Sequence, residues 1–465
     1  MPAASNTNSI AARAPRTASI PTLADRMAAG KALRAQMPRS AHALLSAQRR
    51  DPVQLLQASN AGRVTHLVPI RYGRMLHSPF TFLRGSAAVM AWDLGHRPHS
   101  KLFTQLCGDC HLGNFGGFAS PERALLFGIN DFDETLPGPF EWDTARLAAS
   151  FVVAARSAGI AERICKDAAA TVVRTYRTRM AELGNMRAID QWYHPLEMNT
   201  LAQLARSAET RRRRRNLINE ARKRTSDRIF PRIAEVVGGK VRIADHPPLI
   251  YHPRNAAFAR ESAQFWKRYV ETLPEERRVL LDRYRLVDMA VKVVGVGSVG
   301  TRCSIALLMA GADDPLLLQI KEARASVLEP YAGKSRYPNN GLRVVVGQRI
   351  LQAASDIFLG WSRLESTRVD YYVRQLRDMK VSLDLEAMSA GEFVEYAEAC
   401  GWALARAHAK AVDPAIIAGY LGRGDTFDRA TARFAVAYAD RTESDHLALV
   451  KAARTGRIRA VTEEA

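Results

Sequence analysis

Acidic, amide and imidazole side chains are concentrated in two nearby stretches, QLCGDCHLGNFGGF at 105–118 and INDFDE at 129–134. Apolar segments, KLFTQL and ALLFGI, come just before the polar residues and predict short buried strands. Carboxylate and amide oxygens gathered at strand ends suit a hard cation such as Mg²⁺. The candidate residues of this magnesium site are Asp109, His111, Asn114, Asp131, Asp133 and Glu134.

The same stretches allow three other interpretations. Cys107, Cys110 and His111 match the C-x-x-C-H pattern of c-type haem attachment, but that chemistry needs export and the sequence shows no export signal. A zinc site would need further cysteine or histidine ligands at suitable spacing, and none lies nearby. An acidic turn cluster that caps helices is the third alternative. The density of polar side chains favours the magnesium site.

A second group of residues begins at VGVGSVG, where Gly295, Gly297 and Gly300 form G-x-G-x-x-G after the strand-like MAVKVV. Dinucleotide folds and kinase glycine loops both use this pattern. A dinucleotide fold requires a helix next and an acid about twenty residues later. Here TRCSIALLMAG, a GADDP turn and LLLQIKEA predict a three-strand meander, and Lys321 occupies the position of the acid. This argues against a dinucleotide oxidoreductase.

A lysine on the third strand can reach nucleotide phosphates that the glycine loop covers. The alternative for Lys321 is a lysine on an edge strand. Downstream, FLGWSRLESTRVDYYVRQL predicts a hairpin with a strand over 370–376. In a nucleotide-binding lobe this strand would form the hinge beside an adenine, with Tyr371 and Tyr372 either there or in the core.

The two groups together resemble a known class of enzymes. CGDCHLGNF and INDFDE resemble the catalytic loop and metal-binding segment of aminoglycoside phosphotransferase-like, protein-kinase-like enzymes, which carry H-G-D-x-H-x-x-N and then I-D-F or I-D-W. The wider set of motifs, from SPFTFLRGSAAVMAWDL to YYVRQLRDMK, is also similar to an uncharacterised bacterial family, domain-of-unknown-function family 2252. That similarity spans most of residues 50–440 and implies no reaction by itself.

The order of the motifs differs from that of ordinary kinase-like enzymes. There the glycine loop and lysine come first, and here they follow the catalytic loop. The segment ACGWALARAHA resembles the helix that usually precedes the catalytic loop, and it lies near the C-terminus. The resemblance therefore implies a circular permutation, which folds tolerate because contacts, not chain order, define them.

The resemblance implies a role for each matching residue. Asp109 would be catalytic and would orient or deprotonate an acceptor hydroxyl, and Lys321 would pair with the phosphates. Asn114 and Asp131 match the metal ligands, with Asp133 as an additional ligand. The residues of the covering loop are Gly295, Gly297, Ser298 and Gly300. The implied cofactors are ATP and Mg²⁺, and the acceptor is an unidentified small molecule or protein; nucleotidyl transfer uses similar parts.

Several residues depart from the motif or leave its details open. Cys107 stands where histidine is usual, and Asp143 in FEWDTARLA resembles a structural aspartate. The acidic partner of Lys321 is not obvious: Glu322 and Glu329 are the candidates, with neutral Gln348 as an alternative in place of an acid. Arg84, in FTFLRGSA, is predicted to form a buried salt bridge, with a phosphate clamp as the alternative.

Composition and texture set the fold class. The chain has 465 residues and a net charge of +20, with globular proportions of apolar and charged residues, and no apolar run long enough for a membrane span. Segments with a helical pattern, then a β-rich pattern, then a helical pattern again predict an α+β protein.

With the resemblance, this implies a two-lobed, circularly permuted kinase-like fold with a mainly helical large lobe and a small antiparallel β lobe. The expected divisions are a flexible N-terminal tail and lead-in at 1–45, a helical lobe with the catalytic loop at 46–285, a nucleotide-binding β lobe at 286–385, and completing helices at 386–465.

The basic charge is concentrated at 206–232, with eleven lysines and arginines against three acids. Leucine, isoleucine and alanine at loosely helical intervals predict a solvated charged helix. A nucleic-acid contact is the alternative, although stacking aromatics are missing.

Five cysteines make no disulfide framework, and the N-terminus lacks the apolar core of a secretory signal, so we expect a cytoplasmic protein. A catalytically weak nucleotide-binding regulatory protein and a nucleic-acid-binding protein remain alternatives to the phosphotransferase.

Overall fold

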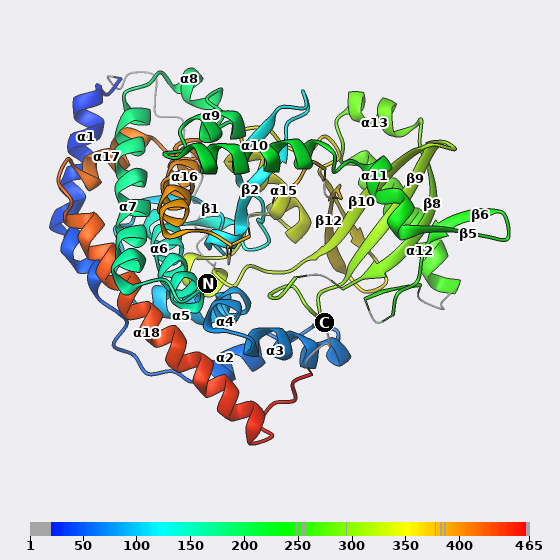
Figure 1. The fold of residues 1–465 in the computed structure, drawn as a ribbon, viewed down its shortest axis with the longest axis horizontal. Helices are drawn as coiled ribbons and strands as arrows, with labels where there is room; N and C mark the ends of the chain where they lie inside the picture. The colour runs from blue at the N-terminus through cyan, green and yellow to red at the C-terminus, as the bar shows by residue number, and fades with distance from the viewer. Residues whose placement is uncertain are drawn as a thin grey trace, which may run out of the picture.

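The computed structural model describes residues 20–247, 249–252, 256–293, 295–376, 378–381, 384–385 and 387–461. Residues 1–19, which make up much of the expected N-terminal tail, lie outside this description. The fold is α+β, with a larger helical part on one side and a sheet on the other (Figure 1). Among the described residues, no helix has the length and apolar character needed to cross a membrane.

The helical part combines segments from both ends of the chain. In Figure 1 the N-terminal helix α1 lies beside α17, and α18 runs along α6 and α7, in agreement with their contacts. The helices of this part are α1 (Leu23–Ala32), α2 (Pro52–Ala58), α3 (Val68–Leu76), α4 (Pro79–Gly85), α5 (Ala87–Gly95), α6 (Phe140–Ser157), α7 (Glu162–Gly184), α8 (Ala188–Trp192), α9 (Met198–Gln203), α10 (Ala208–Arg222), α16 (Ala390–Ala409), α17 (Pro414–Leu421) and α18 (Thr426–Arg454).

The core of the helical part lies between α6, α7 and α16. Helix α6 is buried along almost its whole length, which explains its many alanines, because small side chains let helices on every side approach closely. On α16 one residue in each turn contributes to a buried stripe. The stripe consists of Phe393, Tyr396, Cys400, Leu404 and His408.

The sheet has six antiparallel strands in the order β11-β12-β10-β9-β8-β7. They are β7 (Ile250–Tyr251), β8 (Arg285–Lys292), β9 (Cys303–Gly311), β10 (Asp314–Ala323), β11 (Gly360–Leu364) and β12 (Val369–Gln375). The predicted meander β8-β9-β10 and the hairpin β11-β12 are therefore confirmed. The alternative of an edge-strand lysine is wrong, because β10 lies between β9 and β12. Strand β7 also extends the sheet to residues before 286.

Alternating side chains on the strands bury both faces of the sheet. Ala306 and Leu308 of β9 pack with residues of α12 (Ala256–Glu271) and α13 (Glu275–Leu281). Ile305 and Leu307, with the opposite orientation, pack with α11 (Ser226–Ile233) and the hairpin β5 (Ala234–Val237) and β6 (Lys240–Ile243). The remaining helices, α14 (Glu329–Ala332) and α15 (Asn340–Leu351), connect β10 to β11.

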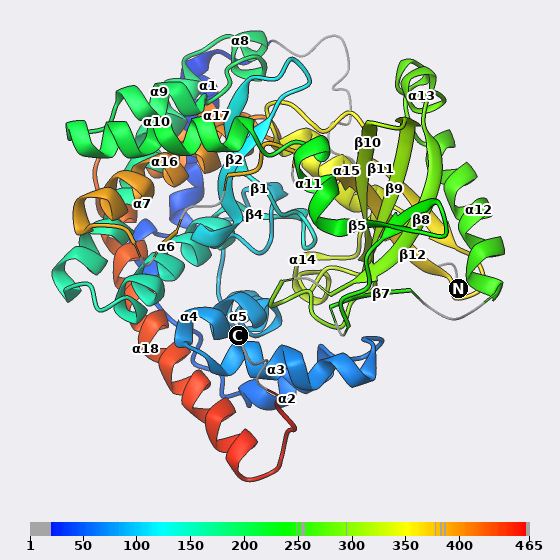
Figure 2. The same cartoon turned by 45° about the vertical axis from the view of Figure 1, so that its right-hand side comes forward.

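Two short antiparallel strand pairs lie between the helices and the sheet (Figure 2). Strand β1 (Phe103–Leu106) pairs with β4 (Leu136–Pro139), and β2 (Phe115–Ala119) pairs with β3 (Leu125–Ile129). The predicted strands in KLFTQL and ALLFGI are β1 and β3. Their loops carry the polar stretches from which the sequence predicts a metal site.

The basic segment forms helices α10 and α11, and α10 packs beside α16. Arginines of this segment meet a row of acids on α16: Arg213 lies 3.0 Å from Glu392, Arg214 lies 2.6 Å from Glu395, and Arg206 pairs with Glu398. Part of the positive charge that raised the nucleic-acid interpretation is therefore neutralised within the fold.

We predict that Arg214→Gln lowers the free energy of unfolding by about 1–3 kcal/mol. Arg214 donates to Glu395 and to the Leu201 carbonyl at 2.8 Å, and the Glu395 carboxylate would remain buried without its cation. Arg212→Gln is the matched control, since Arg212 is exposed on the same helix; its effect should stay within about 0.5 kcal/mol. Urea denaturation of the two variants measures the difference, and equal effects would contradict the prediction.

Candidate functional site

The predicted residues come together where three segments of the fold meet. The loop at 107–114 follows β1, the segment at 130–134 connects β3 to β4, and Lys321 extends from β10 of the sheet. A backbone hydrogen bond from Asn130 N–H to the Asn114 carbonyl, 2.8 Å long, joins the first two segments. Residues more than 180 positions apart in sequence thus reach one site, as the 2.8 Å contact between Lys321 and Asp133 shows.

Asp143, in the first turn of α6, holds the loop in place. Its buried carboxylate accepts the backbone N–H groups of Cys107 at 2.8 Å and Gly108 at 3.1 Å. Gly108 has φ of 87°, a conformation that glycine adopts without strain. The Asp143 Oδ2 that accepts the Cys107 N–H also lies 3.2 Å from His408 Nε2, and Tyr176 contacts His408 Nδ1 at 2.9 Å. These contacts fit a structural aspartate.

Asp109 is held by an arginine that the sequence interpretation missed. Arg146 donates from Nε to Asp109 Oδ1 at 2.7 Å, and its Nη2 contacts the same oxygen. The other oxygen, Oδ2, lies 3.7 Å from His111 Nε2. Burial raises the pKa of Asp109, and Arg146 opposes this rise. The signal in the sequence was the spacing in D-T-A-R, which puts Asp143 and Arg146 one helical turn apart and facing the same loop.

Lys321 lies between the two aspartates of the D-F-D sequence. Its Nζ is 2.8 Å from Asp133 Oδ2 and 3.9 Å from Asp131 Oδ2, and the lysine is only 3% exposed. Burial disfavours its charge, but the two carboxylates outweigh this and raise the pKa of Lys321 well above its usual range. Tyr372 donates to Asp133 Oδ1 at 2.6 Å. Tyr372 is buried and faces this site from β12.

The acidic partner of Lys321 differs from the candidates named from the sequence. Glu322 pairs with Arg302 at 3.1 Å, because adjacent residues of a strand face opposite sides of the sheet. Gln348 donates to Gln352 at 2.9 Å, and Glu329 makes no ion pair with any described residue. Asp133 takes this role, and it was expected to be a metal ligand instead.

Asn114 and Asp131 offer oxygens that a cation could use. Asn114 donates a hydrogen bond from Nδ2 to the Asp109 carbonyl at 2.8 Å. Its Oδ1 accepts no hydrogen bond from any described residue. The Asp131 side chain is 35% exposed, and its Oδ1 accepts the Asp133 N–H at 3.2 Å. Burial opposes the effect, but Lys321 and Arg374 lower the pKa of Asp131 to about 2. An ionised carboxylate and an amide oxygen fit Mg²⁺.

His111 and Glu134 differ from Asn114 and Asp131 in what they offer to a cation. Burial, with Arg84 and Arg146 nearby, lowers the pKa of His111 well below its usual range, so the ring is neutral. Glu134 accepts the Val327 N–H at 2.7 Å, and Ser326 donates to its carbonyl at 2.8 Å. Glu134 therefore connects the metal-binding segment to the chain that follows β10.

The glycine loop joins β8 to β9 and lies against the helical part. Arg63 donates to the Val299 carbonyl at 2.6 Å, and Val64 N–H donates to the Gly300 carbonyl at 2.8 Å. Arg74 also donates to the Gly295 carbonyl. A side chain at Gly297 would place its Cβ 2.9 Å from the Arg84 carbonyl, so only glycine allows this approach. Ser298 lies in the same turn and accepts the Thr301 N–H at 3.0 Å.

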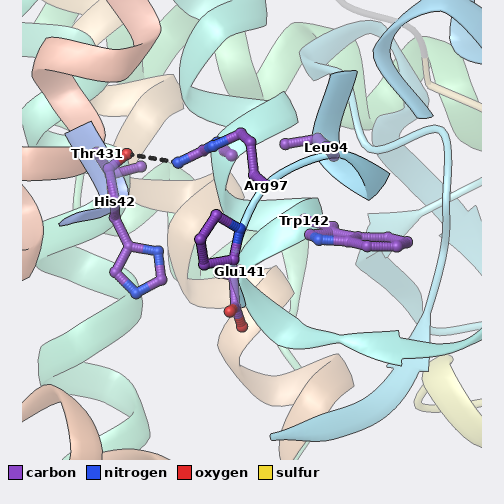
Figure 3. Close-up of a pocket in the computed structure, with 8 residues that line it drawn as sticks. His42, Leu94, Arg97, Glu141, Trp142 and Thr431 are labelled. Carbon is purple, nitrogen blue, oxygen red and sulfur yellow. Dashed lines mark hydrogen bonds between the residues drawn. The ribbon is translucent and has the colours of Figure 1, made fainter. Parts of the chain in front are cut away.

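Two further groups of side chains were compared with this site. Donor atoms of Cys107, Cys110 and Asp143 lie within 4.8 Å of one another, but no fourth His, Cys, Asp or Glu ligand joins them in the described part of the chain. Both Asp143 oxygens already accept hydrogen bonds, which does not favour the zinc alternative. Elsewhere, His42, Arg97 and Glu141 surround a cavity of about 10 Å³ (Figure 3), which is room for one water molecule.

We predict that Asp143→Ala lowers the free energy of unfolding by about 3 kcal/mol, because two buried N–H groups lose their acceptor. Urea denaturation measures this loss. Asp440→Ala is the control, since Asp440 is 64% exposed in its ion pair with Arg156, and it should cost less than about 1 kcal/mol. A comparable small loss in Asp143→Ala would show that the loop does not depend on this carboxylate.

Comparison with known proteins gives one match. A family model described as an uncharacterized protein conserved in bacteria (DUF2252) matches residues 63–452. No curated protein and no solved structure matches the chain. The match covers most of the 465 residues and includes every residue of the site described above. The protein is a member of the DUF2252 family.

Proposed function

We propose that the protein is a kinase-like phosphotransferase that uses ATP and Mg²⁺ and acts on an unidentified hydroxyl acceptor. The observation that carries the proposal is the position of Lys321, which extends from the sheet to lie 3.9 Å from Asp131 and 2.8 Å from Asp133. In kinases a lysine on the third strand binds the nucleotide phosphates and an aspartate of the metal-binding segment holds Mg²⁺ against the same phosphates, so the two groups face one site.

The order of elements in the sheet supports the same function. The glycine loop joins β8 to β9, Lys321 lies on the third strand β10, and helix α15 follows. Kinases place the glycine loop, the lysine and the next helix in this sequence. Their helix supplies a glutamate to the lysine, whereas here Asp133 contacts it. Arg343 of α15 nevertheless reaches the same segment, where it donates to the Asp133 carbonyl at 2.8 Å.

The contacts of α16 support a circular permutation. Tyr396 donates to the carbonyls of Leu112 at 2.7 Å and Phe115 at 3.1 Å, and His408 lies against Asp143. A helix near the C-terminus thus packs against the loop that follows β1, as the resemblance implied for the helix that precedes the catalytic loop in ordinary kinases. Interleaving of the two chain ends in the helical part is consistent with this order.

Each residue has a role in this proposal. Lys321 would bind the nucleotide phosphates, and Asp133 and Tyr372 would hold its side chain. Asn114 and Asp131 would hold Mg²⁺, which when bound offsets phosphate charge. Both oxygens of Asp133 have partners, so Asp133 is assigned to the lysine and not to the metal. Asp109 would accept the acceptor proton on Oδ2, while Arg146 fixes the orientation of Oδ1.

A nucleotide-binding regulatory protein is the second candidate. The contact with Arg146 favours it, because a guanidinium paired with a carboxylate stabilises the ionised form and weakens it as a base. Turnover separates the two candidates, whereas nucleotide binding is common to both.

We predict that ATP raises the Tm of the protein when Mg²⁺ is present. Ligands that bind only the native state stabilise it, by about 2.7 kcal/mol at a hundredfold excess over Kd. Thermal-shift titration measures the effect, which should be weaker in EDTA and lost in Lys321→Met and Asp131→Asn. The exposed Arg215→Met is a control that should keep the shift. No shift in the wild-type protein at millimolar ATP would overturn both candidates.

We predict that Asp109→Asn binds ATP as the wild type does and loses turnover by roughly 100-fold or more, the usual contribution of a general base. Release of ADP, measured with a panel of hydroxyl-bearing small molecules and proteins, gives the rate. If Asp109→Asn releases ADP at the wild-type rate, Asp109 has no role in the mechanism. Binding without turnover in the wild type would support the regulatory candidate.

A further inference from the structure

Arg84 lies between the two loops of the proposed active site. It belongs to the last turn of α4, and its carbonyl is 2.9 Å from where a Cβ at Gly297 would stand. Its side chain extends toward the catalytic loop, where Nε is 3.7 Å from the position of a Cβ at Gly113. Its Cζ is 6.0 Å from the centre of the Phe80 ring. One arginine therefore contacts the glycine loop with its backbone and the catalytic loop with its guanidinium.

The charge of Arg84 has no partner among the described residues. The guanidinium forms no ion pair within 4.0 Å and no hydrogen bond, and its Nε is buried. The salt bridge predicted from the sequence is therefore wrong. Other buried arginines differ: Arg71 donates to the Asn60 side chain at 2.5 Å and the Gly85 carbonyl at 2.8 Å, and Arg343 donates to three carbonyls.

An unpaired guanidinium is costly in a site from which water is partly excluded. Burial lowers the pKa of Arg84, and the nearby carboxylates of Asp109 and Asp131 oppose this, so the side chain keeps its charge. Both carboxylates already have a nearer cation, Arg146 for Asp109 and Lys321 for Asp131. Among the described residues Arg84 is thus a positive charge without an ion pair or a hydrogen bond of its own, and the charges of Asp109 and Asp131 still act on it.

We infer that Arg84 binds the terminal phosphoryl group of a nucleoside triphosphate. The inference rests on the proposed function and extends it to the recognition of the group that is transferred. A planar guanidinium presents a fork of N–H donors that matches phosphate oxygens. Arg84 lies between the glycine loop and the catalytic loop, where the terminal phosphoryl group would pass to the acceptor. The ligand class is therefore a triphosphate and not a diphosphate.

Phosphoryl transfer involves no covalent change in Arg84. The acceptor oxygen forms a bond to the terminal phosphorus while the bond from that phosphorus to the bridging oxygen breaks, and its electron pair remains on the diphosphate. The acceptor proton passes to Asp109. Arg84 donates hydrogen bonds to the oxygens of the moving phosphoryl group and stabilises their charge, as arginines do in other phosphoryl transfers.

Calorimetric titration of two nucleotides tests the inference. The probes are a non-hydrolysable ATP analogue and ADP, each with Mg²⁺, and the proteins are the wild type, Arg84→Met, Arg84→Lys and the exposed control Arg49→Met. Arg84→Met should weaken binding of the analogue roughly 10- to 100-fold and change ADP binding by less than about twofold. Arg84→Lys should lie between Arg84→Met and the wild type, and Arg49→Met should match the wild type.

Other outcomes separate the two proposals. Equal losses for both nucleotides, or none for either, would overturn the role of Arg84 and leave the proposed function standing. Binding of neither nucleotide to the wild type would overturn the proposed function and the inference with it. Thermal unfolding without nucleotide checks the fold: Arg84→Met should keep or raise the Tm, because it removes an unpaired charge, whereas a clear fall would show a structural role and overturn the inference.

Discussion

The buried charge of Lys321 is the constraint on which the organisation of this protein depends. An ammonium group that is almost fully buried is stable only beside negative charge, and no described carboxylate of the sheet forms an ion pair with it. The acids come from the segment between β3 and β4, on the helical side. Charge neutralisation therefore requires the sheet and the helical part to meet at this point, and the meeting creates the candidate site.

Arginines fix the arrangement around that ion cluster. Arg343 joins α15 to the carbonyls of Asp133 and Thr135, and Arg324 donates to the carbonyl of Ser59 at 3.3 Å. Arg146 holds Asp109 in the same manner. Guanidinium groups suit this task because several donors in a rigid plane can satisfy carbonyls from different segments. Arg84 is an exception to this pattern, because its guanidinium has no hydrogen bond or ion pair among the described residues, and the proposed phosphate contact would explain it.

Local patterns in the sequence were sufficient for much of the fold. Apolar segments separated by a turn predicted the strands β8 to β10, and the helical texture on either side of them predicted the helices, because such patterns follow from geometry within one segment. The partner of Lys321 did not follow from such a pattern. Candidates close in sequence, such as Glu322, face away from it, and Asp133 reaches it only through the packing of two distant segments.

The sequence by itself determined the identity of the chemical groups: a glycine loop, a lysine on the third strand of a meander, and acids with an amide after two short strands. It also determined that arginines are concentrated at 206–232. Only the tertiary structure decided which charges neutralise each other, since Coulomb attraction depends on distance in space and not on separation along the chain. It assigned the acids of α16 to the arginines of 206–232, Arg146 to Asp109, and Asp133 to Lys321, and within the described part of the chain it left Arg84 without an ion pair.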